Sequence, residues 1–155
     1  MRRLMILIVV VFGVVSLSGG SPAIAAAYPC PPTEPDSMGP FYEPGAPLRL
    51  SVGKGYRLTG TVKSAADCAP IPQAVIEFWL ANPQGVYDDQ HRATVVADPA
   101  GTYRFESNAP PDDDFRPPHI HIRVTAEGFA PLVTQHYPED GASETEFDLV
   151  LIPTD

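Results

Sequence analysis

The chain has 155 residues, of which 44% are hydrophobic, and a formal net charge of −9 at pH 7. This length suits one domain with a hydrophobic core of its own. The excess of acidic side chains argues against nucleic acid and anionic membranes as partners, because both are negatively charged.

The first 25 residues are typical of a secretory signal peptide. Arg2 and Arg3 precede an apolar run of about 14 residues, and the cleavage-site pattern Ala23-Ile24-Ala25 follows. The run is shorter than the roughly 20 residues of a spanning helix, so we expect no permanent membrane anchor. Residues 26–155 would then form one secreted or periplasmic domain, and loss of the two arginines would change the charge from −9 to −11.

Cys30 and Cys68 are the only two cysteines. An even pair in an exported chain predicts a disulfide, because oxidising compartments let such bonds persist. The bond would close a loop of about 38 residues and tie the Pro-rich segment after the leader to the body of the fold. Two buried free thiols are the alternative.

Strands rather than helices are predicted for the rest of the chain. The full sequence contains 19 prolines and 12 glycines, and no stretch after the leader repeats apolar residues at helical spacing over three turns. Short runs rich in β-branched and aromatic residues are bounded by turn formers. In chain order these runs are 56–63, 74–80, 92–97, 102–106, 119–125, 132–137 and 146–152. We therefore predict an all-β fold, a two-sheet antiparallel β-sandwich of about seven to eight strands with little helix.

The strand at 119–125 carries two histidines, His119 and His121. Side chains alternate along a strand with period two, so both imidazoles should point to the same face. Two neutral imidazoles on one face can bind one metal ion. The same pattern also arises by chance in half-buried strands, so the pair alone does not establish a metal site.

Several segments resemble, in order, the landmarks of the intradiol ring-cleavage dioxygenases, and together they span nearly all of the chain after the leader. They are Gly39–Tyr42, Leu58–Val62, Pro70–Asn82 with Gly85–Tyr87, Arg116–His121 and Leu132–Tyr137. The resemblance implies a β-sandwich that holds a non-haem ferric ion, Fe(III), through two tyrosines and two histidines. It also implies that a bound catecholate is activated there for attack by O2.

The resemblance assigns roles to individual residues. Tyr87 matches the first tyrosine ligand, and His119 and His121 match the histidine pair. Arg116 matches an arginine that stabilises negative charge on the substrate, and Gln135 matches the glutamine of a Thr-Gln-x-Tyr segment. These types suit the chemistry, because a phenolate is a hard donor that favours Fe(III) and a guanidinium supplies fixed positive potential.

The chain departs from the family at the second tyrosine ligand. That ligand precedes the first histidine in the family, but residues 107–115 contain no tyrosine. We expect Tyr103, just before this stretch, to pack in the core. A carboxylate of Asp112, Asp113 or Asp114, or a water molecule, could occupy the fourth position; alternatively, the three acids form a solvated loop.

Three aromatic side chains complete the sequence predictions. The resemblance implies that Phe41 and Tyr42 line the substrate pocket, although aromatic residues in such a segment can also simply anchor it. His136 follows Gln135 and should face the other side of its strand, toward the surface.

Two functions remain open at this point. One is an exported dioxygenase that acts on a catechol-type aromatic substrate with O2. The other is a non-catalytic extracytoplasmic module that holds a metal or binds a ligand after losing one iron ligand. The sequence does not specify the substrate, the identity of the metal or whether the chain forms a homo-oligomer.

Overall fold

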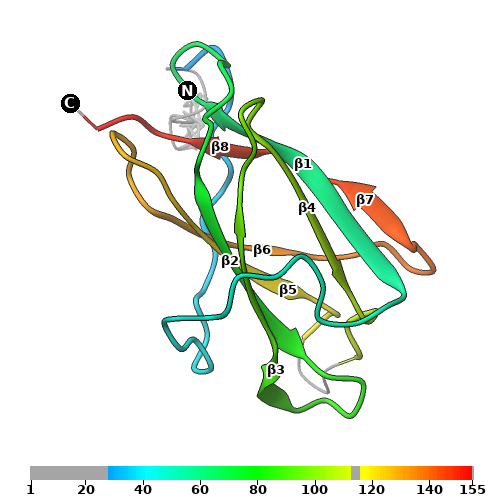
Figure 1. The fold of residues 1–155 in the computed structure, drawn as a ribbon. Helices are drawn as coiled ribbons and strands as arrows, with labels where there is room; N and C mark the ends of the chain where they lie inside the picture. The colour runs from blue at the N-terminus through cyan, green and yellow to red at the C-terminus, as the bar shows by residue number, and fades with distance from the viewer. Residues whose placement is uncertain (1–27, 113–115, 155) are drawn as a thin grey trace, which may run out of the picture.

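The computed structural model describes residues 28–112 and 116–154. The predicted leader of residues 1–25 lies outside the described residues. The described part forms strands and no helix, so it contains no helix that could cross a membrane. The strands are β1 (Tyr56–Ser64), β2 (Val75–Ala81), β3 (Tyr87–Val96), β4 (Thr102–Ser107), β5 (Ile120–Thr125), β6 (Leu132–His136), β7 (Glu144–Glu146) and β8 (Leu149–Leu151) (Figure 1).

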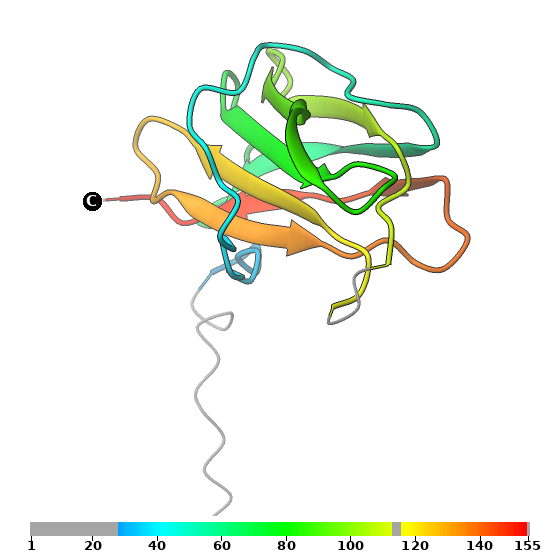
Figure 2. The same cartoon turned by 90° about the horizontal axis from the view of Figure 1, so that it is seen from below.

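The strands form two four-stranded sheets, and the prediction of an all-β sandwich is confirmed. One sheet has the order β3-β2-β5-β6, and all its neighbours are antiparallel. In the other sheet β1 lies between β4 and β7, and β8 also pairs with β1. The two sheets lie face to face (Figure 2). One feature differs from the antiparallel prediction, since β7 and β8 both run parallel to β1.

Gly60 explains why the predicted strand at 146–152 is divided into β7 and β8. A Cβ atom on Gly60 would lie 2.1 Å from the carbonyl oxygen of Phe147, between the two short strands. Only glycine allows two backbones to come this close. The amide of Phe147 donates to the carbonyl of Thr59 at 2.7 Å, so the crossing is itself hydrogen-bonded. β7 and β8 therefore pair with β1 one after the other along its length.

The core lies between the sheets and is built from alternate residues of the central strands. Ile76, Phe78 and Leu80 of β2 point inward and are fully buried. The ring of Phe78 stacks on Phe105 of β4 with 4.2 Å between centroids. Since a strand buries every second side chain on one face, the intervening residues of β2 point to the outer face of their sheet.

That outer face is also covered, by residues 28–43, which we call the N-terminal arm. In Figure 2 the arm, coloured blue to cyan, crosses β6 and β5. The Tyr42 hydroxyl donates to the Glu77 carboxylate at 3.2 Å, and its ring packs 5.0 Å from that of Trp79. Arg123 of β5 forms an ion pair with the same carboxylate at 2.5 Å. Polar and aromatic side chains thus fill the space between the arm and the sheet.

The start of the arm is fastened to the sandwich at two points. The predicted disulfide between Cys30 and Cys68 is present and ties the start of the arm to the segment after β1. Further along, the amide of Thr33 donates to the carbonyl of Val150 in β8 at 3.1 Å. The arm is therefore an integral part of the fold and not a free tail.

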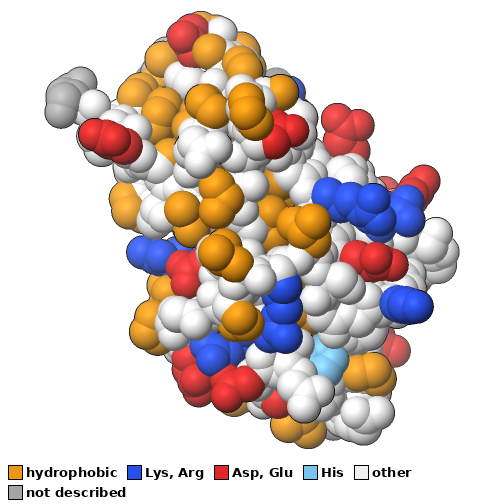
Figure 3. Space-filling model, viewed as in Figure 1, with side chains coloured by type: hydrophobic (Ala, Val, Ile, Leu, Met, Phe, Trp, Pro, Cys, Tyr) orange, Lys and Arg blue, Asp and Glu red, His pale blue; other side chains and the backbone are white. Residues whose placement is uncertain are grey.

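Charges on the surface are mixed in sign. On the face drawn in Figure 3, acidic and basic side chains are interspersed around hydrophobic ones. This face presents no continuous basic surface of the kind that binds a phosphate backbone.

His136 is buried, and the prediction that it faces the surface is wrong. It is 6% exposed, and its Nε2 lies 2.6 Å from the hydroxyl of Tyr56 in β1. The prediction failed because both faces of this sheet are covered, one by the other sheet and one by the arm. Burial lowers the pKa of His136 from 6.5 to about 4.

We expect His136 to make the fold sensitive to acid. Because its pKa is lower in the folded state, the unfolded chain binds a proton first as the pH falls below 6.5. The contribution of His136 is therefore fully present above pH 6.5 and declines toward pH 4. Urea unfolding between these pH values should show a smaller loss of stability in a His136→Gln variant than in the wild type. Equal losses in the two proteins would contradict the assignment.

Candidate metal centre

Two histidines and one tyrosine converge at one end of the β3-β2-β5-β6 sheet. His119 directly precedes β5, His121 is its second residue, and Tyr87 is the first residue of β3. The Nε2 atoms of the two histidines lie 3.2 Å apart. The Tyr87 hydroxyl lies 3.1 Å from Nε2 of His119. The two predicted histidines therefore share a face, and the predicted tyrosine reaches them.

The register of β2 brings these residues together. Trp79 pairs with His121 across one side of β2, and Ala81 pairs with Tyr87 across the other. The pairing with β3 shifts between Trp79 and Ala81. Irregularities of this kind redirect side chains near the end of a strand. The shift is thus the local feature that sets Tyr87 beside the histidine pair.

Both histidines are placed to bind a metal through Nε2, which coordinates as the lone-pair nitrogen of a neutral imidazole. Nδ1 of His119 lies 2.8 Å from the carbonyl of Pro117 and must carry the proton there, because a carbonyl only accepts. When the ring is neutral, its Nε2 therefore carries the lone pair. His121 is 1% exposed and stacks on Trp79 at 4.9 Å. Burial, helped by the charges of His119 and Arg116, lowers the pKa of His121 to about 4.

The distances from His119 Nε2 to the other two donor atoms suit ligands of one metal ion. Two donors that each lie about 2.1 Å from an ion at angles of about 90–110° are roughly 3.0–3.4 Å apart. The observed spacings of 3.1 and 3.2 Å match this range. No group of three His, Cys, Asp or Glu side chains is placed to hold a metal within residues 28–112 and 116–154. A site here therefore needs the oxygen of Tyr87 as its third donor.

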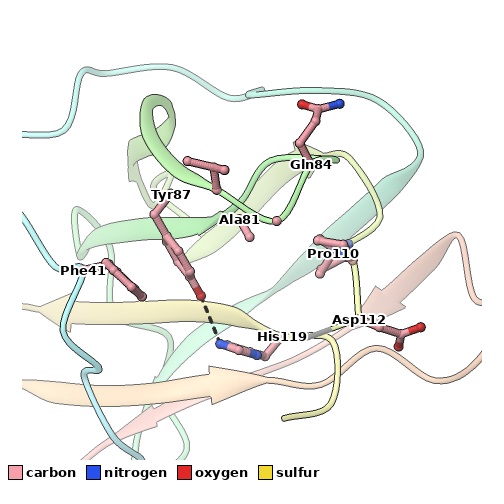
Figure 4. A pocket seen from close by; sticks show the side chains of 10 residues that line it. Phe41, Ala81, Gln84, Tyr87, Pro110, Asp112 and His119 are labelled. Carbon is pink, nitrogen blue, oxygen red and sulfur yellow. Dashed lines mark hydrogen bonds between the residues drawn. The ribbon is translucent and has the colours of Figure 1, made fainter. Parts of the chain in front are cut away.

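A cavity of about 570 Å³ opens beside Tyr87 and His119. Phe41 of the arm lines it and stacks on the Tyr87 ring with 4.4 Å between centroids. Figure 4 shows the Tyr87 hydroxyl directed at His119 across the cavity. The predicted pocket residue Tyr42 is not among the lining residues, because its hydroxyl is turned to Glu77.

The second tyrosine ligand has no replacement among the described residues of the preceding loop. Asp112 lines the cavity, but its side chain points away from the Tyr87–His119 pair (Figure 4). Asp113 and Asp114 lie outside the described residues. Tyr103 is in the core as predicted, where its hydroxyl donates to the carbonyl of Phe147.

Arg116 and Gln135 contact each other at the edge of the centre. Nη2 of Arg116 donates to Oε1 of Gln135 at 2.6 Å. Tyr137 joins them, since its hydroxyl lies 3.2 Å from the same Arg116 nitrogen and donates to Asp36 of the arm at 2.8 Å. Neither Arg116 nor Gln135 lines the cavity described above.

Sequence reasoning missed the contribution of the arm to this network. Gln135 also donates from Nε2 to the carbonyl of Ser37 at 2.6 Å. Residues Ser37 to Gly39 therefore lie against Gln135 and His121, although they are distant from both in sequence. The arm's Gly39-Pro40-Phe41-Tyr42 landmark was the one signal in the sequence that pointed to this region.

Comparison with known proteins identifies the family. No family model matches the chain. The chain is 31% identical over 143 residues to the chlorocatechol 1,2-dioxygenase of Pseudomonas sp. (strain P51), covering 70% of this chain and 57% of that protein. It is 31% identical over 153 residues to the hydroxyquinol 1,2-dioxygenase of Rhizobium sp. (strain MTP-10005), covering 76% of this chain and 52% of that protein. The chain thus spans a little over half the length of these relatives.

Solved structures show the same fold. One is the dioxygenase domain of a dioxygenase carbohydrate-binding protein fusion from the cellulolytic bacterium Streptomyces sp. SirexAA-E. It superposes with a TM-score of 0.72 at 25% identity and covers 79% of this chain and 99% of that domain. The sequence landmarks, the sandwich and these similarities agree, and the chain belongs to the intradiol ring-cleavage dioxygenases.

Proposed function

We propose that this chain is an exported, non-haem iron dioxygenase that opens catechol-type rings between the two hydroxyl-bearing carbons. Both atoms of O2 would enter the product, a dicarboxylic acid, as the carbon–carbon bond breaks. The observation that carries the proposal is the convergence of Tyr87, His119 and His121 beside an open cavity. Export is proposed from the leader-like sequence and is supported by the Cys30–Cys68 bond.

The donor set suits ferric iron. The phenolate of Tyr87 would supply negative charge, and the two neutral imidazoles would hold the ion without adding charge. Bound iron would supply the Lewis acidity that holds the substrate oxygens and a route for electrons from the ring to O2.

The remaining residues bind and orient the substrate. Phe41, stacked on Tyr87, offers an apolar surface on which an aromatic ring can pack. Arg116 supplies positive potential that extends to the metal centre, since its charge helps to lower the pKa of His121. Such fixed charge stabilises negative charge that develops during the reaction.

The alternative is a non-catalytic module that keeps the scaffold. It is favoured by one observation, since the described loop before His119 offers no second tyrosine and Asp112 points away from the pair. In the family, that tyrosine completes the iron site. Its loss would leave iron held by three protein donors.

Metal analysis and turnover separate the two functions. The exported chain should contain about one iron and absorb visible light through tyrosinate-to-iron charge transfer. It should also consume one O2 for each catechol ring opened. A Tyr87→Phe variant should be pale, whereas Tyr103→Phe, which alters a core tyrosine, should keep the colour. Coloured protein that turns over no catechol, or colourless protein after iron reconstitution, would favour the non-catalytic module.

A further inference from the structure

The second ring nitrogen of His121 is buried without a hydrogen bond. Nδ1 has no partner of acceptable geometry, although the whole side chain is 1% exposed. A buried polar atom of this kind is rare and usually marks a function or a missing partner. Histidines that bind metals through one nitrogen almost always donate the other N–H to an acceptor. An acceptor for Nδ1 is therefore expected close by.

The arm supplies the nearby acceptor. The carbonyl of Ser37 lies close enough to His121 to oppose the lowering of its pKa. Gly39, two residues on, packs so tightly that an added Cβ would lie 3.0 Å from the Cε1 atom of the His121 ring. Its φ of +69° also favours glycine. The same Cβ would lie 3.5 Å from Nε2 and 3.9 Å from Nδ1, so the arm forms a wall against the Cε1 corner of the ring, between its two nitrogens.

Gln135 holds this wall in place. Its Nε2 donates to the Ser37 carbonyl at 2.6 Å, and its Oε1 accepts from Arg116 at 2.6 Å. Both ends of the amide are therefore occupied by protein groups. Gln135 is also 5% exposed and pairs with His121 across β5 and β6. Its position therefore suits it to orient the Ser37 carbonyl and Arg116, and not to contact a substrate.

We propose that Gln135 is a positioning residue that holds the Ser37 carbonyl as the acceptor for Nδ1–H of His121 when Nε2 binds the metal. The inference rests on the proposed function and extends it, because it makes the N-terminal arm part of the metal centre. The proton of His121 lies on Nδ1 in the metal-bound protein. Without metal, Nε2 can carry it instead and donate to His119, 3.2 Å away.

The chain offers a matched control in the preceding residue. Thr134 donates from Oγ1 to the carbonyl of Glu34 at 2.8 Å, so it also fastens the arm to β6. That bond does not involve Ser37. Thr134→Val removes a bond to the arm while leaving the wall beside His121. Gln135→Met removes both amide bonds, and Gln135→Glu keeps an acceptor for Arg116 but loses the donor to Ser37.

The first test is the rate at which the iron-loaded full chain loses iron to a chelator, followed by metal content and visible absorbance. Loss of an outer partner of a metal ligand typically weakens binding about 10–100-fold. Both Gln135 variants should therefore lose iron at least about tenfold faster than the wild type, and Thr134→Val within about twofold of it. Similar rates in all three variants, or wild-type rates in both Gln135 variants, would overturn the proposal. Circular dichroism confirms that each variant is folded.

The second test does not depend on iron and separates this inference from the proposed function. Nitrogen-15 spectra of the metal-free chain report the protonation of each histidine nitrogen. Gallium(III), a diamagnetic ion of the same charge as Fe(III), should convert wild-type His121 to the Nδ1–H form. In the gallium-loaded chain the Nδ1 signal of His121 should move in Gln135→Met and stay in place in Thr134→Val. An unmoved signal in Gln135→Met would refute the role of Gln135 even if iron binds, and a wild type that binds neither ion would refute the proposed function.

Discussion

His121→Ala protein should retain neither iron nor ring-cleaving activity. The substitution removes one of three donor atoms whose spacings of 3.1 and 3.2 Å suit a single ion. Even an outer partner of a ligand contributes about 10–100-fold to affinity, so loss of the ligand itself should weaken binding by more than about 100-fold. His119→Ala should have the same effect. Metal content after dialysis against a chelator, with O2 uptake on catechol, measures both losses.

His91→Ala is the matched control for this prediction. His91 also lies on the β3-β2-β5-β6 sheet, but its Nδ1 contacts the carboxylate of Asp88 at 2.8 Å. It is not among the residues that line the cavity beside Tyr87. The variant should bind iron and turn over substrate as the wild type does. If His91→Ala lost iron to the same extent as His121→Ala, the metal would be bound elsewhere or nonspecifically.

Removal of the disulfide should cause the largest loss of stability. The Cys30–Cys68 bond joins residues 38 apart in sequence. In the chain-entropy account, a loop of this length contributes about 3–4 kcal/mol. For a domain of this size that corresponds to a fall in Tm of roughly 10–15 °C. A Cys30→Ser, Cys68→Ser double variant should show this fall by calorimetry, as should the wild type after reduction.

Comparison of the reduced wild type with the double variant provides the control. Both lack the bond, so their melting temperatures should agree, and reductant should leave the variant unchanged. A fall of less than about 2 °C would mean that the other contacts of the arm keep it in place without the bond. In that case the arm would be secured chiefly by its backbone bonds to β6 and β8, such as those of Asp36 and Thr33.

The sequence predicted the sandwich and the histidine pair for simple geometric reasons. Alternation with period two placed His119 and His121 on one face, and the structure brings their Nε2 atoms together. The role of Tyr87 came only from the family resemblance. No local pattern predicted that β3 would begin at Tyr87, because the following residues Asp88 to Arg92 are polar and resemble a loop.

The failures have one physical source. Sequence patterns describe one strand at a time, and they assume that a sheet has a buried face and a solvated face. Here the arm covers the outer face and the other sheet covers the inner face, so side chains on both faces are buried. Gln135 and Trp79 are buried on the outer face and His136 on the inner face. The contacts of Ser37 with Gln135 depend on residues 98 apart in sequence, which no local window detects.

The same separation governs when the site can form during folding. The wall beside His121 joins the arm to β6, and the arm is in turn held by β8, through partners 117 residues apart. Contacts between such distant segments form late, because the chain must first close long loops. The histidine pair and Tyr87 belong to hairpins and neighbouring strands that assemble earlier. We therefore expect a stage of folding in which the donor cluster has formed but the arm does not yet cover it, and in which metal could enter.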